Sequence, residues 1–357
     1  MNNKEILNEY SNNIKTYDNF KSKMEILLRE LLEDNLNYHD ISSRTKTKDS
    51  LEKKLISKED KYTDIKEVTD VVGCRIISYF ENDVEEIVEM IRREFNIDEF
   101  NSINKKNILE SNKFGYLSYH LVCSVNDARL SLPEYKKYKD IKIEIQIRSI
   151  LQHAWAEIEH DIGYKNRSEI PSNIRRKFSR IAGLLETADE NFCEIKEELS
   201  VYNNKIKNNK DELFNTDLNL DSLYQYTLNN PIVLEMDTYI TDINKDILNE
   251  TLLKDNLTTP LAKLIYSNIK TIKELDTLIN SKKELILKFT EEFYKYIEDH
   301  DTLNFERGIS YGSLTYLLVT EHKDRDLIIN YLEEIYSADA PQFLIDTLSE
   351  TYETIIS

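Results

Sequence analysis

Residues 141–148 read IKIEIQIR, a strict alternation of isoleucine with polar or charged side chains. Because successive side chains of a β-strand point to opposite faces, this pattern predicts a half-buried strand. Glu144, Gln146 and Arg148 then share the polar face, spaced about 6–7 Å apart. Solvent covers the polar face of many such strands. A row of acid, amide and cation also suits a floor that binds metal and phosphate, and the alternation alone leaves both interpretations open.

The rest of the first 200 residues alternates between helix-like and strand-like segments. Apolar residues recur every three or four positions from Asn3 to Glu33, which predicts an amphipathic helix. β-Branched and aromatic runs predict two more strands, at 71–80 and 117–125. Helical patterns follow at 49–56, 83–95 and 150–164, and from Pro171 to about residue 199.

The length of the chain predicts two domains. Its 357 residues exceed a single domain of roughly 150 residues, and only six glycines and five prolines favour helices over a sandwich of many tight turns. We expect one domain over residues 1–200. The Asn- and Lys-rich stretch 201–220 has the composition of an exposed linker. Residues 221–357 show helical periodicity at 261–269, 285–297 and 327–336 and no catalytic motif, which predicts an all-α accessory domain.

The charge is unevenly distributed along this acidic chain. The net charge of −19 disfavours non-specific nucleic-acid binding. Residues 201–357 carry 15 basic and 28 acidic side chains, a net charge of −13, whereas residues 1–200 carry 32 and 38. Basic side chains cluster at 44–61 and 175–180. Such clusters are usually solvated helix faces, but in an acidic protein they can also hold an anion such as a triphosphate.

Cysteine usage and hydropathy indicate an intracellular protein. Cys74, Cys123 and Cys193 are odd in number and far apart, so neither a disulfide framework nor a cysteine zinc site is expected. No apolar run approaches the roughly 18 residues of a membrane span, and the N-terminus lacks the apolar core of a signal peptide. We therefore expect a cytoplasmic protein without a membrane partner.

Four segments share the motifs of one enzyme family. They are RTKTKDSLEKK from Arg44, DVVGCRI from Asp70, FGYLSYH from Phe114 and EIQIR from Glu144, followed by QHAWAEIEHDIGYK from Gln152. In this order they resemble the synthetase domain of the RelA/SpoT alarmone enzymes, over roughly residues 40–200. The resemblance implies an α+β fold, a nucleotidyltransferase-like mixed sheet flanked by helices. It also implies transfer of pyrophosphate from ATP to the 3′-hydroxyl of GDP or GTP, which makes the stringent-response alarmone (p)ppGpp.

The resemblance also assigns the catalytic residues and a metal cofactor. Asp70 and Glu144 match the acids that hold Mg²⁺, and Glu144 also matches the acid that can accept the 3′-hydroxyl proton. Phosphoryl-type transfer requires charge neutralisation and positioning more than covalent help, which suits two carboxylates. Without the motifs, Asp70 is a turn acid before a strand and Glu144 a solvated strand acid.

The same resemblance assigns the nucleotide contacts. Arg44 and Arg75 match two arginines that sandwich adenine, since guanidinium planes stack on aromatic faces. Lys46, Ser50 and Lys54 match the ATP phosphate contacts, and the last two share a helical face. The residues assigned to the GDP or GTP site, with Tyr116 as the aromatic that stacks on guanine, are Lys113, Tyr116, His120, Gln146, Arg148 and His153.

The resemblance has departures. Leu117 stands where many relatives have Arg or Gln, so one phosphate or regulatory contact is expected to be missing. Only 43 residues precede Arg44, too few for the hydrolase domain of bifunctional relatives, and the three His–Asp pairs are interpreted as surface pairs. We therefore expect a small alarmone synthetase with a helical extension, which by analogy forms a homo-oligomer.

Two other functions stay open. Toxic relatives of these enzymes pyrophosphorylate the 3′ end of tRNA and inhibit translation, and the two basic clusters could hold an RNA backbone, although the overall charge argues against it. The chain could also be a non-catalytic nucleotide-binding regulator. The presence of Asp70, Glu144, Arg44 and Tyr116 argues against that interpretation.

Overall fold

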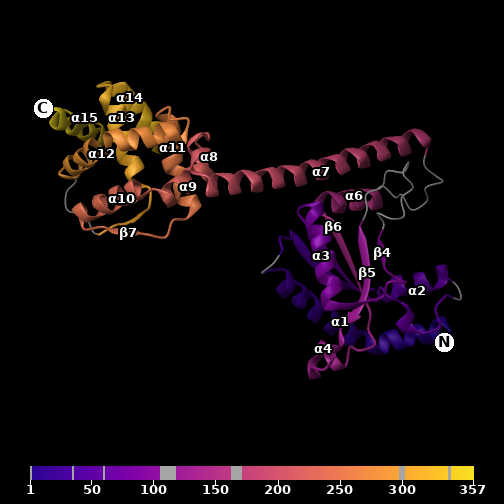
Figure 1. Ribbon diagram of the computed structural model, residues 1–357. Coiled ribbons are helices and arrows are strands. Elements are labelled where there is room, and N and C mark those ends of the chain that lie inside the picture. Colours follow the sequence, from indigo (N-terminus) through magenta and orange to yellow (C-terminus); the bar gives the residue numbers. More distant parts are fainter. Residues whose placement is uncertain are drawn as a thin grey trace. The chain divides into compact units, whose positions relative to one another are not determined.

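The structure of the chain is a computed structural model. It describes residues 2–33, 36–58, 61–104, 118–161, 171–296, 302–336 and 339–357. The chain divides into two compact units, Met1–Glu197 and Glu198–Ser357, and each unit has its own hydrophobic core. The first unit is built around a mixed sheet and the second is almost entirely helical (Figure 1). The expected α+β class with a helical C-terminal extension is confirmed.

The sheet of the first unit has the strand order β1–β2–β6–β5–β3, and β4 pairs with β5. Only β2 and β6 are parallel; the other pairs are antiparallel. The predicted alternation is confirmed, because Ile143, Ile145 and Ile147 are fully buried. The strands are β1 (Asp40–Thr45), β2 (Val72–Ser78), β3 (Phe95–Ile97), β4 (Ile103–Asn104), β5 (Tyr119–Val125) and β6 (Ile143–Ser149).

Helices close the apolar side of this sheet. The amphipathic helix predicted at the N-terminus is α1, and it places Phe20, Met24 and Leu28 in the same core cluster as Ile145. The helix α3 contributes Ile87 to that cluster, so one face of the sheet is sealed and the opposite face keeps its polar side chains. The helices of this unit are α1 (Asn3–Glu33), α2 (Lys48–Ser57), η1 (Ile65–Glu67), α3 (Glu81–Glu94), α4 (Asp127–Leu130), α5 (Pro133–Lys136), α6 (Ile150–Asp161) and α7 (Ser172–Asn208).

The long helix α7 does not bury its apolar stripe. Ile181, Phe192 and Ile195 are each about half exposed. This part of α7 makes polar contacts with the rest of the first unit. The carboxylate of Asp189 accepts a hydrogen bond from Ser149. Lys196 Nζ donates to Asp83 Oδ1 at 2.5 Å, about two turns further along α7. Ion pairs and hydrogen bonds therefore fix this part of α7 where the apolar periodicity alone would predict hydrophobic packing.

The prediction of an exposed linker at 201–220 is wrong. Residues 201–208 complete α7, residues 210–214 form α8, and Ile206, Leu213 and Leu218 are buried in the core of the second unit. The many asparagines misled the prediction, because here they act as helix caps: the side chain of Asn209 accepts hydrogen bonds from the first turn of α8.

The second unit is a helical assembly with one short pair of parallel strands. The segments predicted at 261–269, 285–297 and 327–336 correspond to α11, α12 and α14, but α12 begins much earlier, at a capping box formed by Thr271 and Glu274. No described helix of the chain is long and apolar enough to cross a membrane. The elements are α8 (Lys210–Phe214), α9 (Leu220–Asn229), α10 (Pro231–Asn244), β7 (Ile247–Asn249), η3 (Lys254–Leu257), α11 (Thr258–Tyr266), α12 (Ile272–Tyr294), β8 (Asn304–Glu306), α13 (Ile309–Glu321), α14 (Arg325–Tyr336) and α15 (Gln342–Ile356).

A buried carboxylate holds the N-terminus of α13. Asp237 is fully buried and accepts hydrogen bonds from the backbone N–H of Gly308 at 2.8 Å and of Ser310 at 3.0 Å. Replacement of Asp237 by Ala leaves these donors unsatisfied, which costs about 2–3 kcal/mol of unfolding free energy. We expect a clear fall in the thermal unfolding midpoint measured by circular dichroism. Asp242→Ala, an exposed site on the same helix, is the control, and equal effects of the two variants would contradict this role.

Candidate active site

Four neighbouring strands bring distant parts of the sequence together on the polar face of the sheet. In one row Arg44 of β1 lies opposite Gly73 of β2, and Gly73 lies opposite Glu144 of β6. In the next row Arg75 of β2 lies opposite Gln146 of β6, which in turn lies opposite His120 of β5. Residues that face each other across a ladder project to the same side of the sheet. The register therefore gathers these side chains on one surface.

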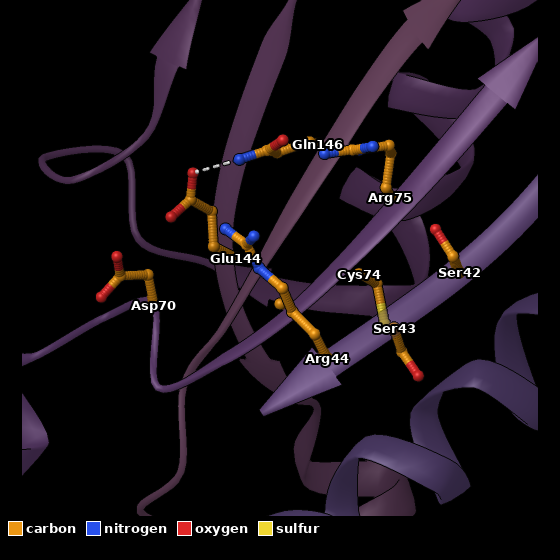
Figure 2. Close-up of a pocket in the computed structure, with 9 residues that line it drawn as sticks. Ser42, Ser43, Arg44, Asp70, Cys74, Arg75, Glu144 and Gln146 are labelled. Atoms are coloured by element: carbon orange, nitrogen blue, oxygen red, sulfur yellow. Dashed lines mark hydrogen bonds between the residues drawn. The ribbon is translucent and has the colours of Figure 1, made fainter. Parts of the chain in front are cut away.

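A cavity of about 210 Å³ opens on this face, and five of the predicted site residues line it (Figure 2). These residues are Arg44, Asp70, Arg75, Glu144 and Gln146. Figure 2 shows carboxylates, guanidinium groups and an amide around one hollow. Gly73 has no side chain to occupy the space between the strands that carry Arg44 and Glu144, which keeps the hollow open. The remaining lining residues, which the sequence analysis did not assign a role, are Ser42, Ser43, Gly73 and Cys74.

Asp70 is held by two lysines at the edge of this cavity. Lys54 Nζ donates to Asp70 Oδ1 at 2.7 Å, and Lys46 Nζ lies 3.0 Å from Asp70 Oδ2. Burial raises the pKa of Asp70, but the hydrogen bonds and charges of Lys54 and Lys46 outweigh burial and hold that pKa below its ordinary value. For Lys54, burial lowers the pKa, but Asp70 has the larger combined effect and raises it. Asp70 and Lys54 are therefore both charged at neutral pH.

Glu144 is the centre of a hydrogen-bonded row. His120 Nδ1 lies 2.6 Å from Glu144 Oε1, and His120 Nε2 lies 2.8 Å from Ser118 Oγ. Gln146 Nε2 donates to Glu144 Oε1 at 3.2 Å, and Arg148 Nη2 donates to Gln146 Oε1 at 2.9 Å. Burial raises the pKa of Glu144, but the hydrogen bond and charge of His120 lower that pKa, and the net pKa lies below its ordinary value. Glu144 is therefore an ionised carboxylate whose position is fixed by hydrogen bonds.

The two arginines predicted to hold adenine differ in their contacts. Arg75 Nη1 donates to Glu157 Oε1 of α6 at 3.1 Å. Arg44 is exposed and has no hydrogen-bonded side-chain partner among the described residues. His153 lies one turn before Glu157, 3.7 Å from its carboxylate, and burial followed by the charge of Arg75 lowers its pKa. Burial and then Arg75 also lower the pKa of Arg148, to about 10.

Of the remaining predicted residues, Ser50 falls outside this cluster of contacts. Ser50 is exposed in the first turn of α2, where its N–H donates to Thr47 Oγ1 at 3.3 Å. Lys113 and Tyr116 lie outside the described residues, as does the Gly115 beside them. Their assigned roles in the acceptor site stay predictions.

Sequence reasoning missed three residues that support the site. Thr47 caps α2 and so positions the helix that carries Lys54, and the signal for it was the Thr-x-x-Ser spacing. Ser118 contacts His120 from two residues away on the same strand face. Glu157 reaches Arg75 from a different element, and no local pattern predicts that contact.

We expect the Asp70 cluster to make the fold sensitive to acid. A carboxyl group whose pKa is lower in the folded state stabilises the fold above its unfolded pKa, and that stabilisation is lost as the pH falls through the folded pKa. The free energy of unfolding should therefore fall below about pH 4, the ordinary pKa of aspartate. Asp70→Asn should lose less stability than the wild type between pH 6 and pH 3 in urea titrations. Equal losses would show that Asp70 does not contribute.

The comparisons with known proteins point to one family. Residues 43–169 match the family described as the region found in RelA/SpoT proteins. Residues 43–169 therefore resemble the RelA/SpoT region, and this match covers less than half of the chain. That region contains every strand of the sheet from β2 to β6, most of the cavity lining and the Asp70 cluster.

Two curated proteins from Bacillus subtilis are similar to part of this chain. The GTP pyrophosphokinase YjbM is 29% identical over 160 residues, which cover 44% of this chain and 72% of the relative. The GTP pyrophosphokinase YwaC is 27% identical over 206 residues, which cover 55% of this chain and 94% of the relative. Among solved structures, the small alarmone synthetase 1 of Bacillus subtilis is 25% identical with a TM-score of 0.44, and the match covers 54% of this chain and 98% of that one.

Proposed function

We propose that the first unit transfers pyrophosphate from ATP to the 3′-hydroxyl of GDP or GTP. The observation that carries this proposal is the single cavity shared by Asp70, Glu144, Arg44 and Arg75, with Lys54 bound to Asp70 at its edge. Two carboxylates and several fixed cations are the groups that transfer between phosphorylated substrates requires. Two curated relatives that are similar to part of this chain are named GTP pyrophosphokinases, which supports the same reaction.

The arginines suit the adenine of ATP. Arg44 and Arg75 project from neighbouring antiparallel strands into the same cavity, and a planar ring between two guanidinium groups makes favourable stacking contacts on both faces. The triphosphate then extends toward Lys46 and Lys54, whose ammonium groups neutralise its charge. Glu157 orients Arg75 from α6.

Glu144 suits the role of general base. Its lowered pKa keeps the carboxylate free of a proton at neutral pH, and His120 and Gln146 fix its direction. In the proposed step Glu144 accepts the proton of the 3′-hydroxyl while the 3′-oxygen attacks the β-phosphorus of ATP. The bond from that phosphorus to the oxygen bridging the α- and β-phosphates breaks, and AMP leaves with that oxygen.

The same two carboxylates fit Mg²⁺. Asp70 and Glu144 offer hard oxygen ligands on one cavity and are both ionised, while the described residues contain no group of three or more acidic, histidine or cysteine side chains that would form a complete metal site. Magnesium usually takes one or two carboxylates and completes its shell with water and substrate phosphates, and it neutralises phosphate charge when bound. Asp70 would exchange part of its contact with Lys46 or Lys54 for the ion.

The acceptor nucleotide would lie on the β5 side of Glu144, where His120, Gln146 and Arg148 form the hydrogen-bonded row. Tyr116 would stack on guanine, with Lys113 and His153 as further contacts. Among the described residues of this set, His120 makes the shortest contact with the proposed base, at 2.6 Å.

Transfer from ATP labelled in its γ-phosphate tests the acceptor. The purified full chain is incubated with GDP, GTP or deacylated tRNA, each in a separate reaction with Mg²⁺. We expect the label to appear in a guanosine nucleotide. Label at the 3′ end of tRNA would show the tRNA-modifying activity instead, and nucleotide binding without transfer to any acceptor would identify a regulator.

A further inference from the structure

A second polar cavity lies on the same face of the sheet, beyond Glu144. Lys142 precedes Glu144 by two residues on the strand, and Ser124 of β5 continues the adjoining strand face. The cavity has a volume of about 470 Å³. The residues that line it are Lys61, Tyr62, Lys66, Glu67, Asn101, Ser124, Lys139, Asp140 and Lys142.

Cations outnumber anions in this lining. Of its four lysines, Lys142 pairs with Asp98 at 2.6 Å and Lys66 pairs with Asp140 at 3.1 Å. Lys61 and Lys139 are exposed and have no ion-pair partner in the described part of the chain. Glu67, the other acid of the lining, accepts hydrogen bonds from Thr63. Among the described residues, this lining and Asp98 therefore carry four positive and three negative charges, so a small positive excess remains in a protein whose net charge is −19.

Tyr62 connects this cavity to the Asp70 cluster. The Tyr62 ring is buried, with Lys61 Nζ 5.5 Å from its centroid and Lys54 Nζ 5.7 Å from it. Lys54 is the residue that binds Asp70 at 2.7 Å. The Tyr62 ring therefore lies close to one ammonium group of the Asp70 cluster and to one of the second cavity.

We propose that this second cavity binds an anion with two or more consecutive phosphate groups. Its volume equals that of roughly fifteen water molecules at about 30 Å³ each, which is several times more than a single phosphate ion fills. Flexible ammonium groups bind phosphate as point charges without fixing its orientation. Ser124 and Asn101 add hydroxyl and amide donors. The proposal goes beyond the transfer reaction and depends only on this cavity.

Titration calorimetry of the full chain with inorganic tripolyphosphate tests the proposal. Lys61→Gln/Lys139→Gln removes the two unpaired lysines, and we expect roughly tenfold weaker binding than for the wild type. Lys15→Gln/Lys136→Gln removes the same charge from exposed positions of the same unit that do not line the cavity, and its affinity should stay within twofold.

The source of the phosphates is distinguished by a parallel titration with ATP. If the Lys61/Lys139 variant also loses affinity for ATP, the cavity holds a polyphosphate attached to a nucleoside; if only tripolyphosphate binding falls, it holds a free polyphosphate. Equal tripolyphosphate affinities of this variant and the control would overturn the proposal. A single-stranded oligoribonucleotide is titrated in the same way. If the variant loses affinity for the oligoribonucleotide but not for tripolyphosphate, the proposal is overturned as well. Turnover of ATP is measured separately, so failure of this proposal is distinguishable from failure of the proposed transfer reaction.

Discussion

Replacement of Glu144 by Gln should lower the rate of pyrophosphate transfer by about a thousandfold, several kcal/mol of transition-state stabilisation. Glutamine keeps the size of the side chain but can neither accept the 3′-hydroxyl proton nor bind a cation with a negative charge. It also replaces the acceptor that His120 and Gln146 contact at 2.6 and 3.2 Å. Initial rates at saturating ATP and GDP measure the effect.

Glu134→Gln is the matched control, because Glu134 is an exposed acid of the same unit in α5. This variant should keep nearly full activity. Circular dichroism should show the same fold for both proteins. A Glu144→Gln enzyme that retains half of its activity would remove this residue from the mechanism.

Replacement of Lys54 by Gln should lower kcat/KM for ATP by roughly a hundredfold. Lys54 has two functions in the account: its ammonium group binds Asp70 at 2.7 Å, and it would also neutralise the ATP phosphates. Loss of a partly buried ion-pair partner is costly because the remaining charge keeps its desolvation penalty. The measurement is the initial rate as a function of ATP concentration.

Lys53 offers a control one residue away. It is exposed on the other side of α2 and does not contact Asp70. Lys53→Gln changes the net charge by the same amount, so kcat/KM should stay within about twofold of the wild type. Equal losses in the two variants would mean that general electrostatics, and not the contact with Asp70, sets the rate.

The central strand of the site could be predicted because its periodicity is local. The alternation at 141–148 identifies both the buried isoleucines and the polar row of Glu144, Gln146 and Arg148, and the structure connects that row by hydrogen bonds. Strand β1, at the end of the strand order, could not be predicted in this way. Its sequence DISSRT contains a single apolar residue, Ile41, and it is a strand because β2 supplies its hydrogen-bonding partner.

Tertiary contacts explain the residues that sequence reasoning missed. Glu157 reaches Arg75 across 82 positions of sequence, and Asp70 meets Lys54 only because α2 folds back beside the start of β2. The motifs indicated that Arg75, Asp70 and Lys54 belong together, but not which of them touch. The asparagine-rich composition of residues 201–220 predicted an exposed linker, but three apolar residues of this stretch are buried in the core of the second unit.

Phosphorus NMR of one reaction mixture tests the central claim most directly. The full chain is incubated with equal amounts of ATP and GDP in the presence of Mg²⁺, and the products are followed until the substrates are consumed. The account predicts AMP and a guanosine nucleotide with a new 3′-pyrophosphate in equal amounts, and about a thousandfold slower product formation by the Glu144→Gln variant. Formation of ADP and inorganic phosphate, or of AMP without a 3′-pyrophosphorylated guanosine, would contradict it.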